Sequence, residues 1–247
     1  MANILVPLPD NDFDITEVSV PWKLLRRAGH TVTFATESAR VPAGDPLLIT
    51  GVLFGQLGAE PEPKRFYEEL TGDPAFRSPI RYSDMDAAAF DALLLPGGHA
   101  PGMRQYLGSQ TLGEKVASFW STPKPVAAIC HGVLVLARAK DPETGRSVLA
   151  RSRTTCLPGY MERTAYYLTA WKLGKYYRTY PAYVEEEVRA ALLRPEEQFV
   201  RGPLSLIRKG TDEDDSGAFV VEDGRYISGR WPGDAYLLAK KLLLRLK

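Results

Sequence analysis

The segment Val126-Ala127-Ala128-Ile129-Cys130-His131-Gly132-Val133 decides how the rest of the chain is interpreted. Four apolar residues, typical of a buried strand, lead into a helical pattern from Gly132 with no room for a loop between them. Cys130 stands at this junction, and the residues two positions before and after it, Ala128 and Gly132, are small. This spacing indicates a nucleophile elbow, which lifts one side chain above the carboxyl ends of parallel strands. The alternative is a small cysteine buried in the core.

The helix that follows Cys130 adds an expectation about its chemistry. The dipole at a helix N-terminus stabilises an anion, so we expect the thiol pKa of Cys130 to be lowered. The second cysteine, Cys156, has no such surroundings, and we expect it to be structural.

Strand and helix patterns alternate along the chain on both sides of this turn. They predict one α/β domain over residues 1–247, with a doubly wound, flavodoxin-like, mostly parallel sheet and helices on both faces. Residues 41–80 contain 11 of the chain's 40 Gly and Pro residues, so we expect an inserted loop region with a short helix at about 66–70. The predicted strands cover residues 3–6, 31–35, 90–95 and 125–129, and a hairpin is predicted at 218–222 and 225–228. One predicted helix ends at residue 28, and the others cover 112–120, 132–139 and 234–246.

The composition excludes several classes of protein. The 31 Lys and Arg residues balance 30 Asp and Glu residues, which gives no electrostatic footprint for nucleic acid or an anionic membrane. No apolar run is long enough to span a membrane, and the N-terminus lacks the pattern of a signal peptide. Two cysteines exclude a disulfide scaffold, and three histidines argue against a metal site. We therefore expect a cytoplasmic protein without metal or cofactor.

A second motif, Leu95-Pro96-Gly97-Gly98-His99, follows another buried strand. The two glycines allow the backbone to approach a ligand closely. In a doubly wound sheet this turn adjoins the elbow, so the N–H groups of Gly98 and His131 can form an oxyanion hole. By itself, the motif also fits a plain turn at the end of a strand.

Glu17 lies near the start of the first predicted helix, four residues before Pro21. Proline has no N–H to donate to the Glu17 carbonyl, so the helix is irregular there. The helix start and the elbow share one edge of the sheet, where Glu17 can reach Cys130 if its carboxyl is protonated. An exposed glutamate interacting with the helix dipole fits the spacing equally well.

These motifs together resemble the ThiJ/PfpI family of the class I glutamine amidotransferase-like superfamily over most of the chain. The Cys130-His131-Gly132 sequence is similar to the PfpI protease and the heat-shock chaperone/glyoxalase III branches. The resemblance implies that Cys130 is the nucleophile, that Glu17 hydrogen-bonds it, and that His131 takes part in catalysis with Gly98 as an oxyanion donor. It also places Trp231, in the turn before the last helix, near the nucleophile.

The chain departs from the glutaminases of that superfamily. Its histidines are His30, His99 and His131, and none follows the elbow, so a glutaminase triad cannot be built. His131 is the best base, while His99 either lines the pocket or faces solvent. An acid often orients such an imidazole, and we favour Glu162 because related proteins place an acid in this stretch; a surface glutamate is the alternative.

An aromatic-rich helical segment at about 160–195 is the last feature. We expect its aromatics to pack onto the sheet, although Tyr167 and Trp171, with nearby basic residues, can also form a pocket wall or an oligomer interface. The eight aromatics are Tyr160, Tyr166, Tyr167, Trp171, Tyr176, Tyr177, Tyr180 and Tyr183, and the basic residues are Lys172, Lys175 and Arg178.

The sequence thus predicts a cofactor-free cysteine enzyme. The family resemblance implies that its substrate is a small reactive carbonyl, as for glyoxalase III or a deglycase, or an amide-type bond. The alternative is a non-enzymatic stress protein, either a holding chaperone or a cysteine redox sensor. The resemblance also implies a homodimer or a larger homo-oligomer.

Overall fold

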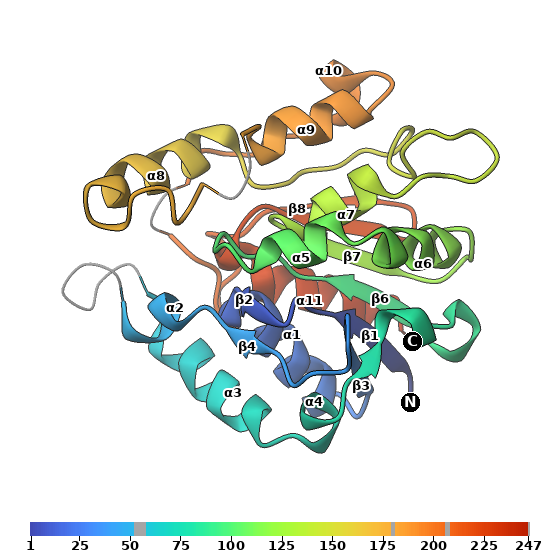
Figure 1. Ribbon diagram of the computed structural model, residues 1–247, viewed down its shortest axis with the longest axis horizontal. Helices are drawn as coiled ribbons and strands as arrows, with labels where there is room; N and C mark the ends of the chain where they lie inside the picture. The colour runs from blue at the N-terminus through green and yellow to red at the C-terminus, as the bar shows by residue number, and fades with distance from the viewer. Residues whose placement is uncertain (52–57, 179–180, 206–207, 247) are drawn as a thin grey trace.

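The computed structural model describes residues 1–51, 58–178, 181–205 and 208–246. A seven-stranded sheet forms its centre in the order β5-β3-β1-β6-β7-β9-β8 (Figure 1). Neighbouring strands are parallel except β8 and β9, which form the hairpin around Gly224. This confirms the predicted doubly wound α/β class. The strands are β1 (Asn3–Pro7), β3 (Thr31–Thr36), β5 (Ile80–Arg81), β6 (Ala92–Leu95), β7 (Val126–Ile129), β8 (Val220–Asp223) and β9 (Tyr226–Gly229).

The two central strands explain why the sheet is parallel. Every residue of β6 and β7 is buried, and both strands are continuously apolar rather than alternating. Such sequences suit strands covered by helices on both faces. Leu95 pairs with Ala128 and Ile129 with Gly229, so β6, β7 and β9 end side by side. Whatever follows these strands therefore meets at one edge of the sheet.

Helices cover both faces of the sheet (Figure 1). On one face α1 packs against α3 and α11, and on the other α5 and α6 pack against α7, which α9 covers in turn. The helices are α1 (Ile15–Arg27), α2 (Pro46–Thr50), α3 (Pro61–Thr71), α4 (Pro74–Arg77), α5 (Met103–Gly108), α6 (Gln110–Trp120), α7 (Gly132–Arg138), α8 (Gly159–Leu173), α9 (Val184–Ala191), α10 (Pro195–Gln198) and α11 (Ala235–Leu244).

The segment 41–80 is more regular than the sequence predicts. The short helix expected at 66–70 is α3, which covers eleven residues and packs on α1 through the buried Phe66 and Leu70. Pro61 stands at the start of α3, where its fixed φ favours a helix and no N–H is needed. The segment also contains α2 and α4, pairs β4 (Ala43–Gly44) with β2 (Asn11–Phe13), and ends in β5 of the main sheet. Residues 52–57 of the predicted loop lie outside the described residues.

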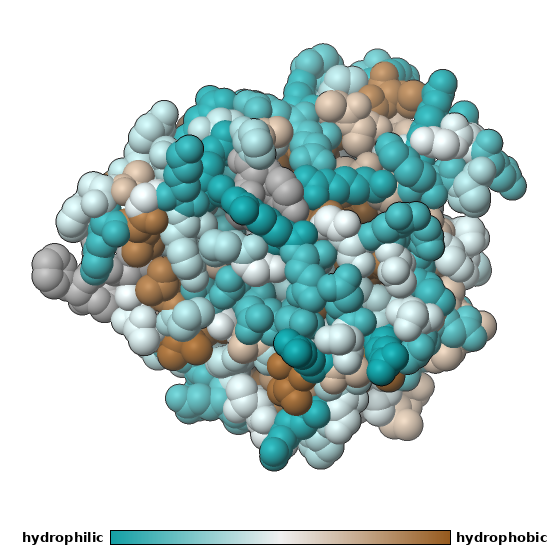
Figure 2. Space-filling model, viewed as in Figure 1, coloured by the Kyte–Doolittle hydropathy of each residue, from teal (hydrophilic) through white to brown (hydrophobic). Residues whose placement is uncertain are grey.

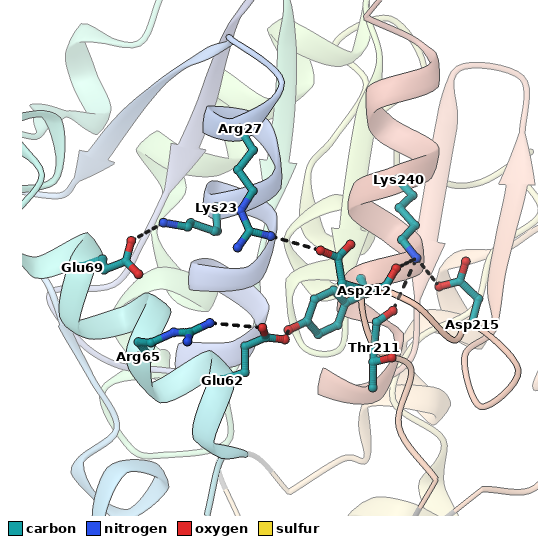
Figure 3. Close-up of polar contacts among 10 residues, drawn as sticks. Lys23, Arg27, Glu62, Arg65, Glu69, Thr211, Asp212, Asp215 and Lys240 are labelled. Carbon is teal, nitrogen blue, oxygen red and sulfur yellow. Dashed lines mark hydrogen bonds and ion pairs between the residues drawn. The ribbon is translucent and has the colours of Figure 1, made fainter.

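Ion pairs hold the outer elements of the first face together (Figure 3). Lys23 of α1 pairs with Glu69 of α3, and Arg27 Nη1 lies 3.1 Å from the Oδ2 of Asp212. Lys240 of α11 donates to the same loop, since its Nζ lies 2.6 Å from the Asp212 carbonyl. Exposed pairs of this kind contribute about 0–1 kcal/mol each, so they set the register of α1, α3 and α11 more than they stabilise it.

The visible surface is predominantly hydrophilic, with scattered hydrophobic residues (Figure 2). Among the described residues, no helix combines the length and the apolar character needed to cross a bilayer. Two aromatics of α8 are among the most exposed large apolar side chains: Tyr167 is 71% exposed and Trp171 is 73% exposed. The expectation that the aromatic segment packs onto the sheet is therefore wrong for these two residues. Tyr180 of the same segment lies outside the described residues.

Candidate active site

Cys130 adopts the strained backbone that a nucleophile elbow requires. Its φ is +56°, a value that few residues other than glycine adopt. The strand β7 ends one residue before it, and α7 begins two residues after it. The Cys130 N–H donates to the Gly229 carbonyl at 3.1 Å, which extends the β7–β9 pairing into the turn. The turn is thus held in place from the sheet side.

Glycine is required where the elbow meets the turn after β6. A Cβ added at Gly132 would lie 2.1 Å from the Leu95 carbonyl oxygen, and a Cβ at Gly97 would lie 2.7 Å from the His131 nitrogen. Both collisions involve backbone atoms, which cannot move aside. The two motifs singled out in the sequence therefore pack backbone against backbone, as their places in the predicted sheet require.

The start of α1 brings Glu17 into this site. Asp14 caps the helix, and its Oδ1 accepts from the Thr16 and Glu17 nitrogens at 2.8 and 3.2 Å. The Glu17 side chain is fully buried, and its Oε2 accepts the Gly97 N–H at 2.7 Å. Its Oε1 is buried without a hydrogen-bond partner in the described structure, and the Cys130 thiol is among the groups that shift the pKa of this carboxyl. Of the two positions open to Glu17 from its spacing, the structure shows the one beside Cys130.

Burial controls the protonation of this pair. It raises the pKa of the Glu17 carboxyl well above its ordinary value, and the neighbouring Asp14 charge raises that pKa further. Burial also raises the pKa of the Cys130 thiol, and the acidic neighbours Glu17 and Asp14 raise it further. The backbone N–H of His131 lowers this pKa by a smaller amount. The expected lowering of the Cys130 pKa by the helix is therefore wrong, because desolvation outweighs the helix N-terminus.

His131 lies directly beside the thiol. Its Nδ1 is 3.5 Å from the Cys130 Sγ, and its side chain is almost fully buried. Burial lowers the pKa of this imidazole well below 6.5, helped by its cationic neighbour Arg138 and by His99. A neutral imidazole can accept a proton, so the resting pair consists of a thiol and a neutral base rather than two ions.

His99 packs on His131 and is only partly buried. The ring centroids of His99 and His131 are 4.7 Å apart, and the ring planes make an angle of 72°. The centroid of the Tyr177 ring lies 6.0 Å from that of His99. Burial lowers the pKa of His99 to about 4. The donor atoms of His99, Cys130 and His131 all lie within 4.8 Å of one another. The low number of histidines argued against a metal site, but it did not predict that two of the three lie beside a cysteine.

Glu162 is placed differently from either expectation. It is 2% exposed, so it is not a surface glutamate. Its Oε2 accepts the Val184 N–H at 3.0 Å, and its Oε1 pairs with Arg178 at 3.5 Å. Oε2 thus joins α8 to the start of α9, and Oε1 joins α8 to the segment between the two helices. Within the described ranges Glu162 makes no hydrogen bond to His131. Burial raises the pKa of Glu162 to about 7.

A small pocket leads to His99. It has a volume of about 240 Å³, and it includes Trp231, which the family resemblance placed near the nucleophile. Three residues of α8 form one wall, but Tyr167 and Trp171 are not among them. Two other hollows, of about 440 and 650 Å³, share no lining residue with this one. The lining residues are Asp14, Leu48, Gly58, His99, Ala165, Leu168, Thr169, Tyr177, Lys209, Trp231 and Pro232.

Sequence reasoning missed the three titratable residues that line this pocket besides His99, which are Asp14, Tyr177 and Lys209. The Asp14-x-x-Glu17 spacing is that of a helix cap, and it signals that the residue before α1 belongs to the site. Tyr177 was one of eight aromatics, and no spacing distinguished it from the others. Lys209, which pairs with Glu60 at 2.7 Å, comes from a loop far along the chain and gave no signal at all.

Comparison with known proteins assigns this chain to a family. A family model described as ThiJ/PfpI family-like matches residues 8–203. The chain belongs to this family. It is 30% identical to an uncharacterised protein of Schizosaccharomyces pombe over 245 residues, which are 96% of this chain and 81% of the relative. It is 26% identical to a deglycase of Pyrococcus abyssi, with 97% of each chain covered.

Solved structures agree with the family assignment at the level of the fold. Glyoxalase III from Candida albicans has a TM-score of 0.69 at 17% identity, with 100% of this chain and 98% of that one covered. The 24 kDa Rapid Encystment Protein of Francisella tularensis has a TM-score of 0.73 at 17% identity, with both chains fully covered. The ThiJ/PfpI-like chain therefore shares its whole architecture with both.

Proposed function

We propose that this protein is a cysteine-dependent enzyme that acts on a small reactive carbonyl compound, with Cys130 as the nucleophile and His131 as the base. One observation carries the proposal: the Cys130 thiol stands on a positive-φ elbow with the His131 Nδ1 at 3.5 Å. A strained backbone that aims a thiol at a neutral imidazole suits nucleophilic catalysis. The name of the Pyrococcus abyssi relative, a deglycase, supports a carbonyl-derived substrate.

The reaction we propose for methylglyoxal balances without a cofactor. The Cys130 sulfur adds to the aldehyde carbon, and its proton passes by way of His131 to the new hydroxyl, which gives a hemithioacetal. His131 next removes the hydrogen on that carbon to form an enediol, and a proton returns to the neighbouring carbon. The product is a lactoyl thioester on Cys130. Water hydrolyses the thioester, which releases lactate and restores the thiol.

The surrounding groups stabilise the charges that arise in these steps. The His131 N–H interacts with the Cys130 sulfur and, with the Gly98 N–H, would donate to the oxyanion at the attacked carbon. Glu17 remains protonated and donates toward the sulfur, because a carboxylate would repel the thiolate. The raised pKa of the thiol makes attack dependent on His131. Each of these roles belongs to the proposal.

We propose that the substrate enters through the pocket lined by His99, which would limit its size, although neither Cys130 nor His131 lines that pocket. A volume of about 240 Å³ accepts a molecule of a few carbons and is below the range typical of drug-sized ligands. Lys209 on its wall would attract a substrate or product with a carboxylate, such as lactate. A peptide segment would need a more open cleft, so we place an amide-type substrate second.

The test compares the two cysteines of the chain. Purified protein is incubated with methylglyoxal, and loss of the dicarbonyl and formation of lactate are measured together, beside a panel of small amides and esters. We expect Cys130→Ala to lose at least about 10³-fold in kcat and Cys156→Ala to retain turnover. Lactate formation that survives Cys130→Ala would contradict the proposal, and cleavage of amides alone would move the substrate to that class.

A second candidate function rests on the exposed side of α8, which adjoins the pocket at Leu168. Tyr167, Leu168 and Trp171 of α8 are exposed by 71%, 51% and 73%, and such exposed apolar groups can hold unfolded clients. One relative, from Bacillus subtilis, is named a general stress protein. A holding chaperone would suppress client aggregation in the Cys130→Ala variant and would lose that effect in Trp171→Glu. If neither variant changes aggregation relative to buffer, this candidate is wrong.

A further inference from the structure

Two of the three histidines and one of the two cysteines in this chain meet at one place. One ligand atom of each of His99, Cys130 and His131 lies within 4.8 Å of the other two. Imidazole nitrogen and thiolate sulfur are the ligands that zinc prefers, and three protein ligands with one open position are typical of its non-structural sites. Elsewhere in the described ranges no similar group of metal ligands occurs.

We propose that His99, Cys130 and His131 form a binding site for Zn²⁺ and that zinc bound there blocks the thiol. The binding itself depends only on the three side chains, whereas the blocking rests on the proposed function of Cys130. Zinc would bond to the Cys130 sulfur and to one nitrogen of each imidazole. The thiol proton would leave to water, the ion would lose all but one of its hydrating waters, and the remaining water would occupy the open position.

The distances fit a tetrahedral ion after a small movement. Zn–S bonds of about 2.3 Å and Zn–N bonds of about 2.0–2.1 Å place tetrahedral ligand atoms roughly 3.4–3.6 Å apart. The Cys130 Sγ and the His131 Nδ1 are already 3.5 Å apart. His99 would need to approach by roughly 1 Å, because ligand pairs in the group reach at most 4.8 Å. It lies on a turn and is only partly buried, so its ring can shift more easily than that of His131.

The pocket supplies the route for the ion. His99 belongs to the pocket wall as well as to the ligand group, so an ion that enters the pocket meets His99 first. Asp14 lines the same pocket and offers a carboxyl oxygen on the way in. The partly exposed ligand faces solvent, while the two buried ligands lie behind it. This order suits a reversible site better than a structural one, where all ligands are enclosed.

The chain contains matched controls for each type of ligand. His30 is the remaining histidine, and its Nδ1 accepts the Ala2 N–H at 3.1 Å at the other end of β1 and β3. Cys156 is the remaining cysteine and is buried like Cys130. The variants His30→Gln and Cys156→Ser thus remove the same donor atoms from outside the proposed site.

The experiment measures binding with ZnCl₂ alone, by competition with a chromophoric chelator, and repeats it with Co²⁺ to detect the sulfur-to-cobalt charge-transfer absorption. We expect one ion per chain. Loss of a group that hydrogen-bonds a metal ligand weakens metal binding at least about tenfold, and loss of a ligand itself should cost at least as much. We therefore expect zinc binding to weaken by at least this factor in His99→Gln, His131→Gln and Cys130→Ser. The charge-transfer band should vanish in Cys130→Ser, and the His30→Gln and Cys156→Ser variants should bind as the wild type does. Equal binding by wild type and His99→Gln, or equal loss in His30→Gln, would overturn the site.

A second measurement keeps the test independent of how the variants fold. In wild-type protein Zn²⁺ should slow alkylation of Cys130 at least about tenfold and leave that of Cys156 unchanged, as peptide mapping would show. Unprotected Cys130 at saturating zinc would overturn the proposal. Neither readout uses a carbonyl substrate. A protein that binds zinc through these residues but does not convert methylglyoxal would refute the proposed function and leave the metal site standing.

Discussion

The two cysteines of this chain have the same burial and very different surroundings. Neither side chain is exposed, and burial raises the pKa of both thiols. Cys156 has its Sγ 3.7 Å from the Leu157 carbonyl and no imidazole among its hydrogen bonds in the described structure. Cys130 has a positive φ and the His131 Nδ1 at 3.5 Å. Neither burial nor a shifted pKa therefore distinguishes the proposed nucleophile from Cys156; the backbone turn and the adjacent imidazole do.

The acids near the two thiols sharpen this difference. Glu185 and Glu162 raise the pKa of Cys156, yet each is held by a cation, Arg201 and Arg178 respectively. Among the described residues no cation pairs with Glu17 beside Cys130, and the hydrogen bond to its Oε2 comes from the backbone N–H of Gly97. An acid paired with a cation stays ionised more readily, whereas an acid without one stays protonated when buried. Among the described ion pairs, Glu17 is therefore the acid of the three that burial can keep protonated without competition from a cation.

The largest expected effect comes from removing the turn at Cys130. Gly132→Ala places a Cβ 2.1 Å from the Leu95 carbonyl oxygen, so the elbow or the turn after β6 must open. We expect a loss of about 3 kcal/mol or more in the free energy of unfolding, with loss of turnover. The matched change near Cys156 is Gly159→Ala, whose Cβ would lie 3.6 Å from Glu185. Urea unfolding should show a change within about 0.5 kcal/mol for Gly159→Ala, and equal costs would contradict the packing.

The next effect comes from removing the base. His131→Gln keeps a polar side chain but cannot take up a proton, so kcat should fall by about 10²–10⁴-fold. The alkylation rate of Cys130 should fall as well, while that of Cys156 stays the same. Steady-state kinetics and peptide mapping after iodoacetamide measure the two effects. A loss of less than about tenfold would show that another group deprotonates the thiol.

Replacing Glu17 should have a smaller effect if its carboxyl is protonated. In Glu17→Gln the amide oxygen can still accept the Gly97 N–H and the amide N–H can still donate toward the sulfur, so we expect kcat to stay within about tenfold of wild type. Glu17→Ala would leave the Gly97 N–H buried without an acceptor, at a cost of about 1–3 kcal/mol in stability. Activity lost equally in both variants would mean that Glu17 works as an ionised group.

The smallest effect concerns Glu162, next to Cys156. Burial raises its folded pKa to about 7 from 4.5, so the folded protein holds a proton that the unfolded chain releases. The resulting stabilisation is present below pH 4.5 and is lost as pH rises through about 7. As pH rises, the wild-type Tm should therefore fall relative to that of Glu162→Gln, by about 2–4 °C for each 1 kcal/mol of stability lost. Thermal unfolding of both proteins across this pH range tests the prediction, and plots of Tm against pH that run parallel would contradict the raised pKa of Glu162.

Much of the fold follows from local patterns in the sequence. The buried runs of β6 and β7, the Asp223-Gly224 turn and the small residues around Cys130 each carry their own signal. The sequence also identified Glu17, His99 and His131, and the structure places all three around Cys130. These residues were accessible because each follows or precedes a recognisable strand or helix end.

The remainder depends on contacts between distant segments. The thiol pKa was predicted in the wrong direction because the helix dipole is visible in a sequence, whereas the burial of the thiol and the approach of the acidic residues Glu17 and Asp14 are not. Glu162 was assigned to His131 by resemblance, whereas Arg178 and Val184, later in the chain, engage both of its oxygens. No periodicity could show which α8 residues face the pocket, because polar and apolar residues are mixed around that helix.

The central claim is that Cys130, and not Cys156, forms a covalent bond to the substrate. Protein mixed with methylglyoxal for less than one turnover, quenched in acid and mapped by peptide mass spectrometry tests it directly. The structure predicts a lactoyl thioester on the peptide that contains Cys130, none on the peptide that contains Cys156, and none anywhere in His131→Gln. Turnover without any adduct on Cys130, or an adduct on Cys156 instead, would contradict the account.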